Sequence, residues 1–482
     1  MLKKCMFIII VFFVALLSVY SDGNSNTEYI IRNINFTIDG TTRESVLSHY
    51  LDIKSGQSFS SKDDLLICLD TKIQLINNQR TLAEGSIDVG YNKDPNNSNI
   101  TFVDLDIYVK DTWNYILLPY VKYDSNDGFL LSLRGRDYNF LGGMETLSLN
   151  LDYIQTNNFE SEYSINGRFE IPFYIWNYNW KFTFEEDLIL SPENPLELKT
   201  KAGISVDIPL NSLTWQASIN QEYHLNQDGE SDADGYYMRT SARFGGSIPT
   251  GINIPLLGEL SYSPGIITSY AYKPFDELSQ ERKGYELGGQ HSVSAGQINW
   301  QENFRDGISF SADQDLRYNF TRELWLSNWD TELQLHKSFG WGGISSRLLG
   351  MYLYNSTDEG IGQPIRGILN ARLNGNAAVF LNVDFPVKIW IWFLDRWFEG
   401  HISPFFDYAL VKSNDGDFSL TEGWYGAGIE GFAFLKAARS IYLRMSLGVD
   451  LEAILDGTSL GSSADRDGES IYELYLGLGH HY

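Results

Sequence analysis

The C-terminal end of this 482-residue chain constrains its fold more than any other feature. Tyr472, Leu474, Leu476 and Leu478 fall on alternate positions, and the chain stops on an aromatic residue, Tyr482. Alternation with a period of two predicts a β-strand with one apolar face. A terminal strand of this kind is typical of the closing strand of a barrel in lipid, where an open sheet edge would leave backbone groups without hydrogen bonds. We therefore expect a transmembrane β-barrel.

The composition agrees with this expectation. Aromatic residues make up 14% of the chain, with 29 Tyr and 12 Trp, and membrane barrels concentrate aromatic residues at the two interfaces. The mean hydropathy of −0.23 fits as well, because half of each barrel strand faces a polar lumen. The formal net charge of −26 argues against nucleic acid as a partner.

Residues 1–21 have the order of a secretory signal peptide. Two lysines precede an apolar run over residues 5–20, and Val19 and Ser21 suit the −3 and −1 positions of a cleavage site. A retained anchor is the alternative, but the run is short for a helix that crosses a bilayer. After cleavage Cys68 is the single thiol, so we expect no internal disulfide. Its leucine neighbours predict a small core residue rather than a reactive or metal-binding one.

Residues 28–110 predict a small α/β domain. Alternating runs predict strands near residues 34–38, 87–91 and 100–109, and two stretches with helical spacing lie between the first and the second strand. Either Ser60 or Ser61 can cap the second helix. With residues 34–40 followed by Val46, Leu47, Gly56 and Phe59, this order resembles the POTRA family, a periplasmic module that precedes certain outer-membrane barrels. An unrelated small α/β module is the alternative.

From residue 113 to residue 482 the pattern of successive strands continues. Apolar residues stand at alternate positions in several segments, for example Leu147, Leu149, Leu151 and Tyr153, and later Leu443, Met445, Leu447, Val449 and Leu451. A soluble sandwich also alternates, but it rarely needs a dozen or more strands. We count sixteen to eighteen strand-like runs and favour sixteen, an even number that brings the last strand back to the side where the first begins. The fold class expected is an all-β transmembrane barrel of about sixteen antiparallel strands with one N-terminal α/β POTRA-like domain.

Three short motifs stand out in this region. An early strand is followed by Asn139, Phe140, Leu141, Gly142 and Gly143; a glycine-rich stretch holds Ile365, Arg366 and Gly367; and a later strand carries Phe405 and Asp407 on one face. In this order they resemble motifs of the bacterial surface-antigen superfamily, which contains the barrel-assembly insertases and the two-partner secretion transporters. Five strand-like runs follow Arg366, as in that family. Ile368 replaces the family's usual aromatic residue, and Ala409 stands where glycine is common.

The resemblance implies that Arg366 lies on a loop that folds back into the lumen and that Asp407 lies on the inner wall. A guanidinium and a carboxylate can pair through two parallel hydrogen bonds, so the pair would fix the loop in orientation as well as distance. In a partly wet lumen we expect it to position the loop rather than to stabilise the barrel. The alternative is that Arg366 is a solvated loop charge. Gly142 and Gly143 mark either a turn or a bend that needs close approach.

Several other motifs resemble catalytic or metal-binding patterns, but their sequence context does not support that chemistry. Gly457, Ser459 and Gly461 have nucleophile-elbow spacing without the strand-to-helix context, and an acidic stretch ending at Asp234 lacks the last glutamate of a calcium loop. His480 and His481 are adjacent, so on a strand they point to opposite faces. We therefore expect no catalytic residue, no metal ligand and no cofactor.

The function that the resemblance implies is non-enzymatic. The barrel would assist insertion or translocation of other proteins at the outer membrane, with the POTRA-like domain in the periplasm binding clients by β-augmentation. Expected partners are unfolded or secreted client proteins, the lipid bilayer and periplasmic accessory proteins. The alternative is a passive pore or structural surface barrel. In insertases of this superfamily the seam between the first and last strands opens sideways, and Gly477 and Gly479 would weaken the pairing of the last strand.

Overall fold

The computed structural model describes residues 27–79, 81–95, 97, 99–176, 178–192, 194–210, 213–226, 234–279, 282–355, 361–389, 396–412, 423–436, 442–455 and 470–478. The predicted signal peptide, the nucleophile-elbow spacing, His480, His481 and Tyr482 lie outside these residues. The chain divides into two compact units, one formed by Met1–Asp39 and Leu47–Lys110 and the other by Gly40–Val46 and Asp111–Tyr482. No helix among the described residues is long and apolar enough to cross a bilayer.

The N-terminal unit is a small α/β fold with the element order that the sequence predicts, plus one short extra strand. Its sheet has the order β2-β1-β4-β3, from β1 (Glu28–Asp39), β2 (Ser58–Phe59), β3 (Leu82–Lys93) and β4 (Ile100–Asp111); the helices are α2 (Glu44–Leu51) and α3 (Lys62–Asn78). Helix α3 begins at Lys62 because the side chain of Ser61 accepts a hydrogen bond from the Asp64 backbone N at 3.0 Å.

The core of this unit is formed by side chains of β4 and of both helices. Buried members include Leu47 and Leu51 of α2, Leu65, Leu69 and Ile76 of α3, and Val103, Leu105, Ile107 and Val109 of β4. The prediction for Cys68 is wrong: the residue is half-buried, because Leu65 and Leu69 occupy the inward stripe of α3 and Cys68 stands beside it.

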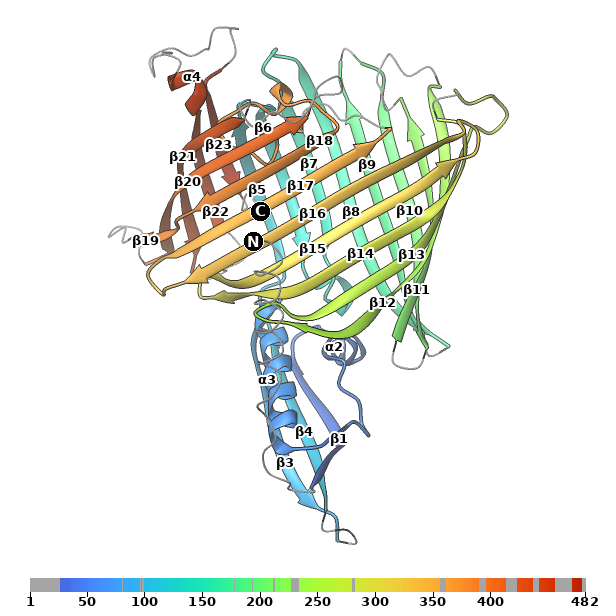
Figure 1. Cartoon of the computed structure of the whole chain (residues 1–482), viewed down its shortest axis with the longest axis vertical. Coiled ribbons are helices and arrows are strands. Elements are labelled where there is room, and N and C mark those ends of the chain that lie inside the picture. The colour runs from blue at the N-terminus through green and yellow to red at the C-terminus, as the bar shows by residue number, and fades with distance from the viewer. Residues whose placement is uncertain are drawn as a thin grey trace, which may run out of the picture. The chain divides into compact units, whose positions relative to one another are not determined.

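The second unit is a closed antiparallel barrel whose strands follow one another in chain order, as the colours in Figure 1 show. The strands are β5 (Tyr115–Asp124), β6 (Gly128–Asp137), β7 (Leu147–Gln155), β8 (Ser161–Ile175), β9 (Tyr178–Leu190), β10 (Glu197–Leu210), β11 (Leu213–Leu225), β12 (Tyr236–Ile254), β13 (Gly258–Tyr272), β14 (Gly284–Gln301), β15 (Phe304–Asn319), β16 (Leu324–Ser338), β17 (Gly343–Tyr354), β18 (Ala377–Asp384), β19 (Val387–Ile389), β20 (Phe398–Lys412), β21 (Trp424–Leu435), β22 (Tyr442–Asp450) and β23 (Tyr472–Leu478).

Strands β18 and β19 are two parts of one strand, since both pair with consecutive stretches of β20 and only Phe385 and Pro386 separate them. Proline has no N–H for the ladder, which explains the interruption. The described residues of the barrel unit therefore form eighteen strands, and the favoured count of sixteen is wrong. The five strands expected after Arg366 are present, so the two additional ones precede it. Strands there, such as β14, are rich in Gly, Ser and Gln and alternate weakly.

Alternation sets the two faces of the barrel wall. In β22 the side chains of Leu443, Met445 and Leu447 are exposed, whereas Arg444 and Ser446 between them are buried. The same arrangement of exposed apolar and inward polar residues recurs in β6 and β20. An outward apolar belt around a polar interior is the arrangement that a bilayer requires of a barrel.

Candidate functional site

The candidate site lies where residues 361–376, which connect β17 to β18 and which we call the inward loop, contact the inner face of the barrel wall. Arg366 of this loop donates from Nε to Oδ2 of Asp407 at 2.8 Å and from Nη2 to Oδ1 at 2.7 Å. Its backbone N donates to Oδ2 as well, at 2.9 Å. The structure thus brings together the arginine and the aspartate of two separate motifs through a two-pronged contact that fixes the guanidinium plane.

Two further carboxylates, from strands on either side of β20, complete the arginine's surroundings. Nη1 of Arg366 lies 2.8 Å from Oδ1 of Asp384 on β18 and 3.3 Å from Oε1 of Glu430 on β21. The guanidinium carbon also lies 3.8 Å from the ring centroid of Phe405, a cation–π distance. Sequence reasoning missed Asp384 and Glu430; their one signal is a charged residue at an inward position of a predicted strand.

The cluster is dry. The Arg366 side chain is 2% exposed and that of Asp407 is 0% exposed, so the expectation of a partly wet pair is wrong. Burial alone would lower the pKa of the Arg366 guanidinium, but the charges of Asp407, Glu430 and Asp384 raise that pKa well above its ordinary value. An arginine side chain stays charged in proteins. Removing it would leave Asp407 and Asp384 buried without their main partner, while Glu430 would keep Arg444, whose Nε donates to it at 3.0 Å.

Glycines on β21 and β22 let the backbone of the inward loop lie directly against the wall. A Cβ added at Gly448 would stand 2.6 Å from the backbone N of Gly367, and one at Gly426 would overlap the carbonyl oxygen of Arg366. Gly367 itself has a φ of 91°, in the left-handed region that glycine adopts freely. The motif glycine thus meets a backbone conformation and a close approach, neither of which an alanine would fit.

The apolar side chains of the inward loop form a separate cluster with the wall. Ile361, Ile365, Ile368 and Leu373 pack with Ala378, Phe380 and Ala409. Both departures from the family pattern, Ile368 and Ala409, lie in this cluster and are fully buried. Ile368 on the loop is smaller than the aromatic residue of the family motif, and Ala409 on the wall is larger than the glycine. The two changes in volume have opposite signs, which limits their effect on the packing of the cluster.

The inward loop is also tied to the two ends of the barrel sheet. The backbone N of Gly367 donates to Oε2 of Glu473 on the last strand at 2.7 Å, and the backbone N of Asn370 donates to Oδ1 of Asn126 at 2.6 Å. Asn126 lies in the turn between β5 and β6. Arg372 of the loop adds an ion pair to Asp450 at the end of β22, at 2.9 Å.

The early motif occupies a different place in the barrel unit, in the segment that follows β6. Asn139 is buried; its Nδ2 donates to Oγ1 of Thr42 at 2.7 Å and to Oδ2 of Asp111 at 3.0 Å. Oδ1 of Asn139 accepts from the backbone N of Met144 at 2.8 Å. Asn139 thus joins three segments, all of which belong to the barrel unit.

The remaining residues of the early motif form a tight turn. Phe140–Gly142 is a short 3-10 helix, in which Leu141 and Gly142 have φ values of 53° and 70°. Phe140 packs against Phe169 with ring centroids 6.1 Å apart, and a Cβ at Gly143 would meet Pro172 at 3.1 Å. Both interpretations of the glycines therefore apply, a turn at Gly142 and a close approach at Gly143.

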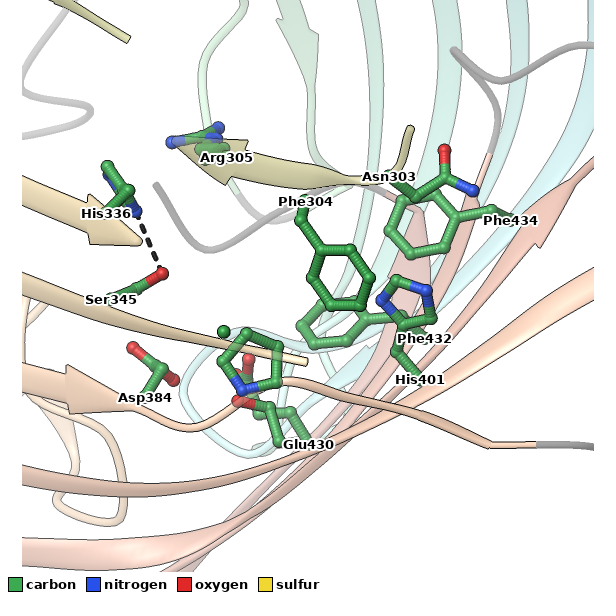
Figure 2. Close-up of a pocket in the computed structure, with 13 residues that line it drawn as sticks. Asn303, Phe304, Arg305, His336, Ser345, Asp384, His401, Glu430, Phe432 and Phe434 are labelled. Atoms are coloured by element: carbon green, nitrogen blue, oxygen red, sulfur yellow. Dashed lines mark hydrogen bonds between the residues drawn. The ribbon is translucent and has the colours of Figure 1, made fainter. Parts of the chain in front are cut away.

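A cavity of about 40 Å³ is lined in part by Asp384 and Glu430 (Figure 2), the two residues that also pair with Arg366. The ring of His401 stacks on Phe304 with centroids 4.5 Å apart, and His336 hydrogen-bonds Ser345 at 2.8 Å. Ser403 lines the cavity, and its buried hydroxyl has no hydrogen-bond partner among the described residues. A cavity of this size has room for a few water molecules.

Of the acidic stretch that ends at Asp234, residues 227–233 lie outside the described part of the chain, and Asp234 itself has protein partners. Within its described part, Oδ2 of Asp234 accepts from Oγ of Ser279 at 2.7 Å and pairs with Nη1 of Arg282 at 3.2 Å. No group of three or more His, Cys, Asp and Glu side chains among the described residues is placed to hold a metal ion.

No family model matches the sequence, and no curated protein is significantly similar to it. Among solved structures, the chain is similar to CdiB from Acinetobacter baumannii, with a TM-score of 0.53 and 12% identity over 93% of this chain and 74% of that one. BamA from Haemophilus ducreyi lacking POTRA domains 1–3 gives 0.42 and 14% over 95% and 85%, and CdiB from Escherichia coli gives 0.42 and 8% over 96% and 92%. This chain and CdiB from Acinetobacter baumannii therefore share one fold, a large closed β-barrel.

Proposed function

We propose that this protein is an outer-membrane barrel that assists the insertion or translocation of other proteins. The observation that carries the proposal is the inward loop, whose Arg366 is held by carboxylates from β18, β20 and β21. A buried charge network costs desolvation and gives little net stability, so its value lies in holding one conformation. An inward loop held in one conformation against the inner wall fits a barrel that binds and passes on a client protein. It fits an open channel less well.

The localisation follows from the same fold. The outward apolar belt fits a bilayer, and residues 1–21 fit a signal for export. We propose the outer membrane for the barrel and the periplasm for the N-terminal unit, which would be a POTRA domain. Unfolded or secreted client proteins, lipid and periplasmic accessory proteins would be the partners.

The N-terminal unit offers an edge for client binding. β3 is the last strand in the sheet order and runs over twelve residues, whereas the opposite edge strand β2 has two. An extended client segment would add to β3 through main-chain hydrogen bonds, a mode that needs little sequence specificity. Hydrogen exchange of the purified protein with an extended β-strand peptide from a client should show added protection in residues 82–93. Protection elsewhere in the unit, with none in β3, would contradict this binding mode.

A passive pore is the second candidate, and one observation favours it. Barrels of sixteen to eighteen strands are wide enough to leave a water channel, and charged side chains on β8, β9 and β10 are partly exposed. The pore would need no client.

Two measurements on the same variants separate the candidates. Arg366→Lys keeps the charge but loses the two-pronged contact. In cells whose only copy of the protein carries this substitution, we expect client assembly to fall. For the purified variant, we expect the single-channel conductance of the barrel to rise. The matched control is Arg168→Lys on β8, where the side chain is 61% exposed; it should leave both unchanged. A steady large conductance of the unaltered protein, with normal client assembly after its depletion, would favour the pore.

A further inference from the structure

The seam that closes the barrel lies between β5 and β23, and the described residues include one end of it. Strand β5 pairs with β6 along its whole length, from Tyr115↔Asp137 to Asp124↔Gly128. With the described part of β23 it pairs at Tyr475↔Asp124 and Leu476↔Tyr123, and next to these pairs the backbone N of Ser125 donates to the carbonyl oxygen of Leu474 at 3.2 Å. Ladder pairs stabilise a sheet, and contacts of side chains across the seam add to that stabilisation.

Side chains and the inward loop supply such contacts at one end of the seam. Nδ2 of Asn126, in the β5–β6 turn, donates to Oε1 of Glu473 on β23 at 2.8 Å. The other carboxylate oxygen of Glu473 accepts from the backbone N of Gly367, and Oδ1 of Asn126 accepts from the backbone N of Asn370. One side chain from each edge of the seam thus binds the other edge and the inward loop at the same time.

We propose that Asn126 and Glu473 form a clasp through which the inward loop holds the seam closed. The clasp makes closure of the seam and docking of the loop one coupled equilibrium, because loss of either removes hydrogen bonds from the other. The inference rests on the proposed function, where it names the residues that regulate opening of the barrel wall. In this role Asn126 and Glu473 are positioning residues.

The chemistry of the pair allows a rescue test. Asn126→Asp removes the donor and sets two carboxylates against each other, while Glu473→Gln removes the charge of the acceptor. In the double variant N126D/E473Q the amide and the carboxylate exchange places. The new amide donates across the seam, its oxygen accepts from the Gly367 backbone N, and the new carboxylate accepts from the Asn370 backbone N.

Opening is measured on purified protein in lipid, with no client present. Spin labels replace Tyr123 on β5 and Met445 on β22 in a Cys68→Ala background; both side chains are exposed and one strand lies between them. Double electron–electron resonance then gives the distance distribution. For N126D we expect about a tenfold rise in the ratio of long to short distances, as loss of a hydrogen bond to a charged group implies. E473Q should show a smaller rise.

The double variant should recover most, but not all, of the closed distribution of the unaltered protein. Nδ2 of Asn126 also donates to Oδ1 of Asp124 at 3.2 Å, and the new carboxylate at position 126 still faces that group. Asp127→Asn is the control: Asp127 lies in the same turn, and its carboxylate accepts from Lys122 at 2.7 Å. Single variants with unchanged distances, a double variant as open as N126D, or an equal effect of D127N would overturn the clasp. If N126D alone fails to fold, recovery of folding in the double variant gives the same answer. Client assembly does not enter this readout, so the clasp and the proposed function can fail separately.

Discussion

Two parts of the barrel wall carry inward charges in opposite ways. On β18, β20 and β21 the partners of Arg366 are all buried, with exposed fractions between 0% and 8%. On β8, β9 and β10 the ion pairs are wetter: Glu170 pairs with Lys181 at 2.8 Å and with Arg168 at 3.1 Å, and the basic side chains are 37% and 61% exposed. Both parts have the same alternating pattern, so alternation alone does not distinguish a wall that faces the open lumen from a wall that binds the inward loop.

The difference comes from the inward loop. Where the loop covers the wall it excludes water, and charged groups there need one another in a defined geometry. Where no described segment covers the wall, charged groups stay partly solvated and gain little from pairing. The β18–β23 part of the wall therefore binds a segment of its own chain, and four tests address this comparison.

The largest effect should come from Arg366→Met. Removing one partner of a buried ion pair leaves uncompensated carboxylates, which costs about 3–5 kcal/mol. We expect a loss of this size in the free energy of unfolding, measured by urea titration in lipid vesicles. A loss below about 1 kcal/mol, the usual value of a solvated pair, would place Arg366 among solvated loop charges.

Gly448→Ala should come next. Its Cβ would lie 2.6 Å and 2.7 Å from two backbone atoms of Gly367, and neither the strand nor the loop backbone can move away easily. Overpacking of this kind costs about 1–3 kcal/mol, and we expect the upper part of that range, read from the same titration. Gly431→Ala on β21 is the matched control, because a Cβ there meets nothing within 4 Å. Equal losses of unfolding free energy in the two variants would show that the inward loop does not need glycine at position 448.

These two residues also show how far sequence reasoning reaches. Alternation predicted the barrel, and motif order predicted that Arg366 meets Asp407, since both are local signals. The need for glycine at Gly448 depends on the register of β22 and on the path of a loop some eighty residues earlier, which no local pattern contains. Asp384 and Glu430 were missed for the same reason: each stands at an ordinary inward polar position until the loop covers it.

The strand count failed for a related reason. Strands β12 and β14 carry Gly, Ser and Thr at positions where an apolar side chain would mark the outward face. Their pairing is set by neighbouring strands and not by a strong pattern of their own. By contrast, the last strands alternate cleanly because their inward face meets a packed loop, so both faces are constrained.

A third test restores the residue types of the family motif at the two positions where this chain departs from it. Ile368→Phe adds volume to a fully buried cluster that also holds Ala409 and Phe380, which should cost about 1–3 kcal/mol through overpacking. Ala409→Gly in the same chain should recover most of that loss by removing a methyl group from the cluster. Additive losses in the double variant, measured by urea titration, would show that the two positions are independent and that their pairing in this chain has no packing basis.

The smallest effect should come from Arg168→Met, the same type of exchange as the first but on the wetter wall. Arg168 pairs with Glu170 and Glu185, at 3.1 Å and 3.4 Å, while remaining 61% exposed. Solvated pairs contribute about 0–1 kcal/mol and are screened by salt, so the loss should fall in that range and shrink further at high ionic strength. The loss for Arg366→Met should keep its size in salt, because its partners are buried. A salt-insensitive loss of several kcal/mol for Arg168→Met would mean that β8, too, is covered from inside, and the contrast between the two walls would disappear.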